Sequence, residues 1–162
     1  MSELTDPFAA FRSFQAAHAA GQIDLHRGRI DRNLFVHRDA PNGAQRFTYV
    51  RFDGATATCM VEFVVCDPVN GSPCFNVGYA VDPAYRSRGL AKQLLPAAIA
   101  EMQLEFGGAG LPDFYVEAIV GLDNIASQKV AASGITQDRI EGIDGESGLP
   151  MYQYLKKFET TG

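Results

Sequence analysis

The chain has 162 residues, of which 46% are apolar and 20% charged, and its formal net charge at pH 7 is −5. This composition predicts one soluble globular domain over residues 1–162, and the acidic balance argues against nucleic acid as a partner, because phosphate binding needs a basic face. No apolar run reaches the length of a membrane span and the N-terminus has no signal-peptide pattern, so we expect a cytoplasmic protein without a membrane partner.

The cysteines and histidines indicate neither a disulfide framework nor a metal site. Cys59, Cys66 and Cys74 are an odd set in apolar or strand-like sequence and contain no CxxC pair. We therefore interpret them as reduced thiols in or near the core. The three histidines show no ligand spacing, and we predict no bound metal.

The N-terminal third predicts one helix and then strands. Phe8, Phe11 and Phe14 recur at helical spacing behind Asp6-Pro7, which predicts a capped helix ending near Gly21. Residues 22–33 are polar and predict a loop. Strands are then expected at 34–37, 46–52 and 56–66, separated by turn signals at 41–43 and 53–54.

The remainder alternates strands and helices. We expect a loop at 67–73, strands at 74–81, 114–120, 135–140 and 151–158, a helix following residue 89 that ends at the glycines of 107–110, and a helix at 124–133. The long helix contains Pro96. Its predicted buried face is Leu95, Ile99, Met102 and Phe106, and its predicted outer face is Lys92, Gln93, Glu101 and Glu105. The order of elements predicts one mixed α/β domain.

Residues 81–95 are the most informative stretch. An apolar strand ends at Val81, and a basic loop with one glycine then opens an amphipathic helix, which is how backbone N–H groups come to bind an anion. From residue 83 to residue 100 the charged side chains are Arg86, Arg88 and Lys92, with no acid. Gly89 has no Cβ and lets a bulky anion approach the backbone. A phosphate-bearing ligand explains this pattern, and the alternative is a helix-cap glycine beside solvated arginines.

Two short segments of the chain resemble a known family. Arg86-Ser87-Arg88-Gly89-Leu90-Ala91 is similar to the Gln/Arg-x-x-Gly-x-Gly/Ala motif of the GNAT superfamily of acyl-CoA-dependent N-acyltransferases. A second match consists of Val116-Glu117-Ala118, the segment 123–130 and Gly134-Ile135, which together resemble that family's fifth strand and following helix. Its form is most similar to the branch that includes the RimJ/RimL ribosomal-protein N-acetyltransferases. The resemblance covers about residues 56–158. It implies an α/β GNAT fold: a twisted, mostly antiparallel sheet with splayed central strands and flanking helices.

The resemblance also implies a coenzyme A site. In that reading the pyrophosphate lies against Arg86, Ser87, Arg88, Gly89, Leu90, Ala91 and Lys92, and the pantetheine arm pairs with the backbone of Ala80 and Val81. Asn124 would bond the pantetheine end, Ser127 would lie near the sulfur or the pyrophosphate, and Lys129 would face the nucleotide phosphates. The alternatives are a helix N-cap for Asn124, a helix-start residue for Ser127 and a solvated charge for Lys129.

The catalytic groups are less clear because the chain departs from the family pattern. Many members carry a tyrosine acid seven residues after the asparagine, where this chain has Ala131, so Ser127 or a water becomes the candidate acid. The strand 74–81 holds no carboxylate, which leaves Glu117 and Glu62 as candidate bases, provided that burial raises the pKa of either one. The alternative for both is a solvent-facing or salt-bridged strand glutamate.

Residues 1–45 are atypical for the family, so the acceptor site does not carry over. Phe8, Phe11 and Phe14, or Tyr49 with Arg51, are candidates to line it. We therefore expect an acetyl-CoA-dependent N-acetyltransferase that acts on a primary amine, either of a small molecule or of a protein. Transfer of a longer acyl group and a non-catalytic CoA-binding regulatory module are the alternatives. The oligomeric state is open, and a homodimer is compatible with the sequence.

Overall fold

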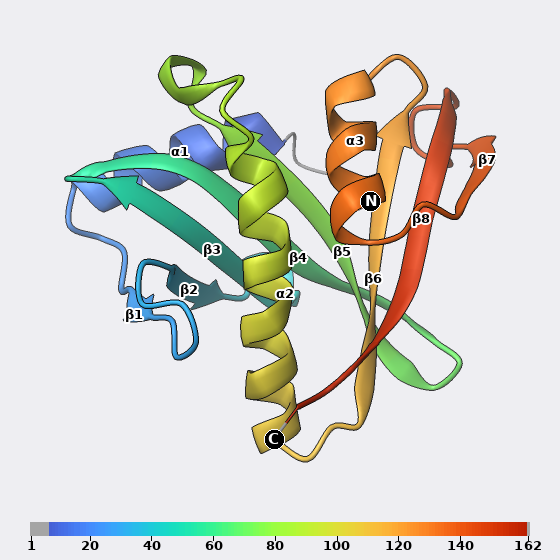
Figure 1. Cartoon of the computed structure of the whole chain (residues 1–162), viewed down its shortest axis with the longest axis horizontal. Helices are drawn as coiled ribbons and strands as arrows, with labels where there is room; N and C mark the ends of the chain where they lie inside the picture. The colour runs from blue at the N-terminus through green and yellow to red at the C-terminus, as the bar shows by residue number, and fades with distance from the viewer. Residues whose placement is uncertain (1–6, 162) are drawn as a thin grey trace. The chain divides into compact units, whose positions relative to one another are not determined.

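The structure, a computed structural model, describes residues 7–161 and has three α-helices and eight strands over that range (Figure 1). The order is α1 (Pro7–Ala19), β1 (His26–Arg27), β2 (Phe35–Asp39), β3 (Arg46–Asp53), β4 (Thr56–Val69), β5 (Ser72–Val81), α2 (Leu90–Gly108), β6 (Asp113–Gly121), α3 (Ile125–Gly134), β7 (Arg139–Ile143) and β8 (Pro150–Glu159). Short 3-10 turns lie at Pro41–Gly43 and Pro83–Tyr85.

The strands follow the order β1-β2-β3-β4-β5-β6-β8-β7. The pairs β1–β2, β2–β3, β3–β4, β6–β8 and β7–β8 are antiparallel, and β5 runs parallel to β6 where Cys74–Asn76 pair with Tyr115–Glu117. This mixed α/β fold with a mostly antiparallel sheet confirms the predicted fold class. None of the helices in residues 7–161 is both long and apolar enough to cross a membrane.

The chain divides into two compact units. The first contains the residues up to Val64 together with Gly78–Glu101, and the second contains Val65–Val77 and the residues from Met102 onward. The elements β4, β5 and α2 each contribute to both.

In the first unit, α1 covers one face of the strands. Phe11 and Phe14 pack with Val50, Met60 and other buried apolar side chains of the strands. The predicted period of the α1 phenylalanines is therefore confirmed, while Asp6 lies outside the described residues. The first turns of α2 lie on the other side of β3 and β4 (Figure 1).

The second unit has an aromatic core. In β6 alternate side chains are buried, as expected of a strand covered on one face. Phe75 stacks on Phe106 with ring centroids 5.4 Å apart, and both rings contact Phe114, which stacks in turn on Phe158 at 6.0 Å. The predicted core positions of α2 are all buried, including Met102 and Phe106 in this unit and Leu95 and Ile99 in the first.

Glu101 was predicted on the exposed face of α2, and this is wrong. Its side chain is buried because its carboxylate accepts three backbone hydrogen bonds, from the N–H groups of Arg29, Ile30 and Asp31 at 2.7, 2.9 and 2.8 Å. A loop with several unpaired N–H groups needs an acceptor when it packs on a helix. The carboxylate meets that need and fixes the loop that leads into β2.

Three boundaries also differ from prediction. The loop expected at 67–73 is a tight hairpin with only Asn70 and Gly71 between β4 and β5, and both have positive φ (49° and 80°), which is the requirement of a type I′ turn. The strand expected at 135–140 begins at Arg139, because the N–H groups of Ile135 and Thr136 still bond to the Ala131 carbonyl at the end of α3. The loop expected at 22–33 contains the two-residue strand β1.

Candidate active site

The junction between β5 and α2 has the backbone conformation of an anion-binding loop. β5 ends at Val81, a 3-10 turn follows, and α2 begins at Leu90. Two loop residues have left-handed backbones: Ser87 at φ +64° and Gly89 at φ +71°. The Gly89 carbonyl accepts the first bond of the helix, from the Gln93 N–H at 3.1 Å. The N–H groups of the first helical turn therefore point out of the helix end without intrahelical partners.

The arginine side chains of this loop are exposed and make only long hydrogen bonds to the protein. Arg86 donates from Nε to the Val81 carbonyl at 3.3 Å and lies over the Phe8 ring at 5.2 Å. Arg88 donates to the Ala84 carbonyl at 3.5 Å and lies over the Tyr85 ring at 5.1 Å. These long contacts leave both guanidinium groups able to turn toward an anion. The Val81 backbone was predicted to pair with the pantetheine arm. Its carbonyl already accepts a hydrogen bond from Arg86, so Arg86 would compete with the arm for that oxygen.

Helix α1 is hydrogen-bonded to the start of the same loop. The Asp82 carboxylate accepts from Arg12 at 3.1 Å, from Gln15 Nε2 at 3.0 Å and from the Ala84 N–H at 3.0 Å. The Gln15 bond, followed by the Ala84 and Arg12 bonds, holds the pKa of Asp82 below its usual value. These contacts fix α1 against the end of β5.

The predicted CoA residues of the second unit lie at the start of α3. Asn124 is the N-cap of that helix, and its Oδ1 accepts from the Ser127 N–H at 3.2 Å. The alternative stated for Asn124, a helix N-cap, is therefore present in the structure. The cap uses the side-chain oxygen, so the amide NH₂ is left for a ligand. Asn124 and Lys129 are exposed, Ser127 is half-buried, and Ala131 is fully buried.

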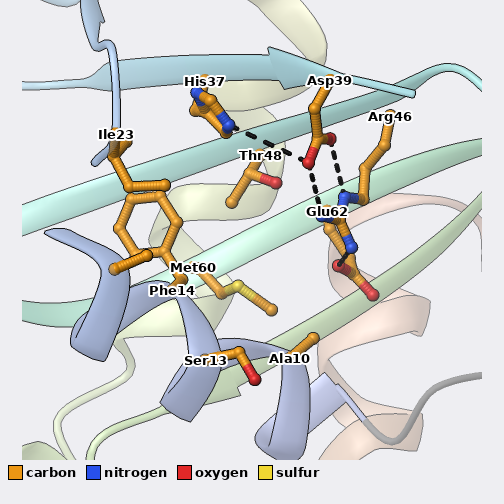
Figure 2. A pocket seen from close by; sticks show the side chains of 11 residues that line it. Ala10, Ser13, Phe14, Ile23, His37, Asp39, Arg46, Thr48, Met60 and Glu62 are labelled. Carbon is orange, nitrogen blue, oxygen red and sulfur yellow. Dashed lines mark hydrogen bonds and ion pairs between the residues drawn. The ribbon is translucent and has the colours of Figure 1, made fainter. Parts of the chain in front are cut away.

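A pocket of about 290 Å³ opens in the first unit, between α1 and the strands (Figure 2). We call it the α1 pocket. It is lined by Ala10, Ser13, Phe14 and Ala17 of α1, by Ile23, by His37 and Asp39 of β2, by Arg46 and Thr48 of β3, and by Met60 and Glu62 of β4.

Strand register explains how these polar side chains meet. Directly paired residues share a face of a sheet, as do residues two apart along one strand. His37 pairs with Thr48, Asp39 pairs with Arg46, and Thr48 pairs with Glu62. The three strands therefore present one row of polar groups toward α1.

The charged groups in this row are connected. Arg46 binds both oxygens of Asp39, from Nε at 2.9 Å and from Nη2 at 2.6 Å, and its Nη1 lies 3.9 Å from a Glu62 oxygen. His37 Nε2 lies 3.9 Å from Asp39, and its Nδ1 contacts the Asp24 carbonyl at 3.0 Å. A carbonyl can only accept, so Nδ1 carries the proton in that contact.

Glu62 is the most deeply buried acid of the pocket, with 9% of its side chain exposed. Burial raises the pKa of Glu62, while the Arg46 charge acts in the opposite direction and the Asp39 charge in the same direction. Glu62 also lies beside β5, because a Cβ added to Gly78 would be 3.7 Å from Glu62 Cγ. This buried carboxylate is therefore next to the strand that leads to Val81.

Glu117, the other predicted base, has a different environment in the second unit. Its carboxylate accepts from Gln153 at 2.6 Å and from Asn76 at 3.4 Å, across neighbouring strands. Glu117 is therefore a half-buried strand glutamate held by two amide partners, an environment that differs from the solvent-facing or salt-bridged one stated as the alternative. Glu62 differs in being nearly buried and in forming an ion pair with Arg46 at 3.9 Å, which is the salt-bridged alternative stated for a strand glutamate.

Sequence reasoning missed several pocket residues. His37, Asp39, Arg46 and Thr48 were not proposed as site residues, and the signal that could have found them is the pairing of β2 with β3 around the turn at 41–43. Of the predicted lining candidates, Phe14 lines the α1 pocket, whereas Phe11 is fully buried in the core. Tyr49 instead contacts Phe63 edge-on at 5.8 Å.

Within residues 7–161, no three His, Cys, Asp or Glu side chains are grouped so that they could hold a metal ion. The absence of a metal cofactor stays a prediction. The three cysteines are free thiols, and Cys59 and Cys74 are buried.

Comparison with solved structures shows which fold this is. A RimL ribosomal L7/L12 alpha-N-protein acetyltransferase without ligand has 14% identity and a TM-score of 0.54, covering 83% of this chain and 95% of the other. RimL in complex with coenzyme A, bound as a disulfide to its own cysteine, has 18% identity and a TM-score of 0.51, covering 72% and 63%. Mycobacterium smegmatis RimJ in complex with CoA-disulfide has 14% identity and a TM-score of 0.52, covering 93% and 60%. At these identities the likeness establishes the fold alone, and this chain spans about three fifths of the last two.

No curated protein matches this chain significantly. The family model described as the acetyltransferase (GNAT) family matches residues 12–134, which is most of the chain and includes both the β5–α2 loop and the start of α3. The chain therefore belongs to the acetyltransferase (GNAT) family and is an enzyme of that type.

Proposed function

We propose that this protein is an acetyl-CoA-dependent N-acetyltransferase that transfers the acetyl group to a primary amine by direct attack in a ternary complex. The observation that carries the proposal is the β5–α2 junction, where two left-handed residues precede a helix N-terminus beside three cations. An acyl-CoA carries a pyrophosphate, and such a junction offers backbone N–H donors, a favourable dipole and positive side chains to that group.

In this proposal the loop holds the cofactor and β5 aligns it. The N–H groups from Arg88 to Ala91, with Arg86, Ser87, Leu90 and Lys92, bind the pyrophosphate, and the backbone of Ala80 and Val81 pairs with the pantetheine arm as an added strand. The amide of Asn124, the Ser127 hydroxyl and Lys129 are separate proposed contacts to the same cofactor, on the strength of the resemblance to RimJ and RimL.

The transfer step needs one base and one acid. The amine nitrogen attacks the thioester carbonyl carbon, the new C–N bond forms, and the C–S bond breaks. The proton released from nitrogen goes to the Glu62 carboxylate, and the departing thiolate takes a proton from Ser127 or a water, so that amide and free CoA are the products. Burial suits Glu62 to this role because a raised pKa makes a carboxylate a better base near neutral pH.

Cofactor binding is tested first. Acetyl-CoA at 100 times its Kd should stabilise the protein by about 2.7 kcal/mol in thermal denaturation. The double variant Arg86→Glu/Arg88→Glu should bind acetyl-CoA at least about tenfold more weakly in calorimetry, since each charge-assisted contact is worth about 1.5–3 kcal/mol. Arg29→Glu/Lys157→Glu changes the net charge equally at exposed sites outside the loop and serves as control. Equal losses in the two variants would contradict the loop assignment.

Turnover is tested separately, by release of free CoA and by mass spectrometry of the acetylated amine. Acetyl-CoA is compared with longer acyl-CoA thioesters on one panel of amines, peptides and polyamines. A product with acetyl-CoA supports the proposal. Faster transfer of a longer acyl group, or CoA binding without product from any amine, would replace it with one of the two alternatives.

A further inference from the structure

The α1 pocket has an unequal charge balance. Its charged lining groups are Asp39, Glu62 and Arg46, which are two acids and one base, together with the imidazole of His37. The remaining lining side chains carry no charge, including all four from α1. A ligand that enters this pocket therefore meets more negative than positive charge, provided that Glu62 is ionised.

The single base is already engaged. Arg46 makes a two-point contact with Asp39, at 2.9 and 2.6 Å, and this partner raises the pKa of Arg46. Bidentate pairs of this kind satisfy the geometry of both groups. Asp39 therefore occupies two N–H donors of the guanidinium and offsets its positive charge, which weakens its attraction for a carboxylate on the ligand. The remaining guanidinium nitrogen faces Glu62 at 3.9 Å.

The rest of the α1 pocket has a largely apolar lining. Phe14, Ile23 and Met60 line one side, and Phe14 and Met60 are themselves part of the buried cluster under α1. A volume of about 290 Å³ is at the small end of ligand pockets. The space suits one small ligand with an apolar body.

We infer that the α1 pocket is the acceptor site and takes a small primary amine with an apolar body and without a carboxylate on the carbon that bears the nitrogen. This inference rests on the proposed function. The ammonium is attracted by Glu62 and Asp39, and the same two acids repel a carboxylate, because the Arg46 charge is already offset by Asp39. Glu62 is next to Gly78 of β5, so an amine held by it lies at the strand along which the thioester is proposed to run. In this inference Asp39 is a specificity-determining residue, because it occupies the Arg46 guanidinium.

Three matched compounds test the charge rule. 2-Phenylethylamine has the ammonium and the apolar body, L-phenylalanine adds a carboxylate, and L-phenylalaninamide adds a neutral group of similar size. We expect kcat/KM for L-phenylalanine to be at least about tenfold below both others, because Glu62 and Asp39 repel its carboxylate. Equal kcat/KM for the amine and the amino acid would overturn the inference, as would a preference for peptides over all three compounds.

Asp39→Asn tests the role of the ion pair. It should release Arg46 and raise kcat/KM for L-phenylalanine relative to 2-phenylethylamine by about tenfold, a change that a purely structural defect would not produce. An unchanged ratio would remove Asp39 as a specificity determinant.

The position of the acceptor is tested by filling the pocket. Ser13→Trp introduces a large side chain from an exposed position that lines it, and Ala16→Trp places the same side chain at an exposed position of α1 outside the lining. We expect Ser13→Trp alone to lose calorimetric binding of 2-phenylethylamine to the CoA-bound enzyme, with acetyl-CoA affinity intact in both variants. Unaltered amine binding in Ser13→Trp would overturn the pocket assignment, and failure of acetyl-CoA to bind the native chain would instead defeat the proposed function.

Discussion

The β5–α2 loop and the α1 pocket differ in the groups that they offer to a ligand: backbone N–H groups in the loop and side chains in the pocket. In the loop, the donors are backbone N–H groups released by two left-handed residues and a helix start, and the side chains around them are exposed. In the α1 pocket, the polar groups are side chains brought together by strand register and closed over by a helix, and Glu62 is almost fully buried.

This difference has an energetic consequence. An exposed loop that presents backbone donors binds an anion without desolvating charged side chains first. A buried carboxylate carries a desolvation cost that the folded protein must offset, and that cost is what raises its pKa. In the proposed function, the loop accordingly binds the cofactor phosphates, and the pocket supplies a carboxylate that can exchange a proton with the amine.

The largest effect is expected from removing the buried carboxylate. Glu62→Gln should lower kcat/KM for the amine about 10²- to 10³-fold, the scale of a lost general base, with acetyl-CoA affinity unchanged. Because burial raises the pKa of Glu62 and the ionised form is the base, the native rate should rise with pH through that raised pKa and then level off. The charged groups that line the pocket with Glu62 are Arg46 and Asp39 from the neighbouring strands, together with the imidazole of His37, and the lining side chains of α1 carry no charge. The variant should lose this step of the pH–rate profile and keep only the ionisation of the amine.

Glu117→Gln is the matched control in the second unit. Its amide partners can bond to a glutamine as well, so we expect kcat/KM within about threefold of the native value. If Glu117→Gln lost the step of the pH–rate profile and Glu62→Gln kept it, the general base would be Glu117 and not Glu62.

The two regions also differ in how much of them the sequence predicts. The loop is local: a strand end, a turn, a glycine and a helix start occur within fifteen residues, and the family motif lies on them. Its position and its cations could be assigned without a structure. The signal at Asn124 is equally local, because the adjacent residues predict a helix N-cap and the family resemblance implies a ligand contact at the same residue.

The α1 pocket depends on pairings between distant strands. His37, Asp39, Arg46 and Glu62 come from three strands, and only the registers between β2, β3 and β4 place them on one face. The prediction for Glu101 was wrong for the same reason. Helical spacing placed its side chain on the exposed face of α2, whereas its hydrogen-bond partners are N–H groups of a loop about seventy residues earlier. Long-range register and tertiary hydrogen bonds leave no periodic signal.

Glu101 also supplies the next largest effect, on stability. Glu101→Ala removes the acceptor of three buried N–H groups and should lower the free energy of unfolding by about 3 kcal/mol. The loop it anchors leads into β2, so loss of amine binding should accompany the destabilisation while acetyl-CoA binding by the folded fraction persists. Urea denaturation measures the change, and the exposed Gln93→Ala on the same helix should stay within about 0.5 kcal/mol of native. A Glu101→Ala protein as stable as Gln93→Ala would show that water replaces the carboxylate.

The smallest effects are expected from substituting two glycines, one in the β5–α2 loop and one beside the α1 pocket. These two variants distinguish the loop from the pocket most directly. At Gly89 an added Cβ meets nothing within 4 Å, but φ is +71°, so Gly89→Ala strains the loop backbone by about 1–2 kcal/mol without a steric clash. At Gly78 an added Cβ would lie 2.9 Å from Pro7 Cγ and 3.7 Å from Glu62 Cγ, so Gly78→Ala must shift the first residue of the helix that lines the pocket. Gly89→Ala should weaken acetyl-CoA binding about tenfold with the KM for amine nearly unchanged, and Gly78→Ala should raise the KM for amine with acetyl-CoA affinity nearly unchanged. Steady-state kinetics with calorimetry measures both, and parallel changes in the two variants would mean that loop and pocket do not act as separate donor and acceptor sites.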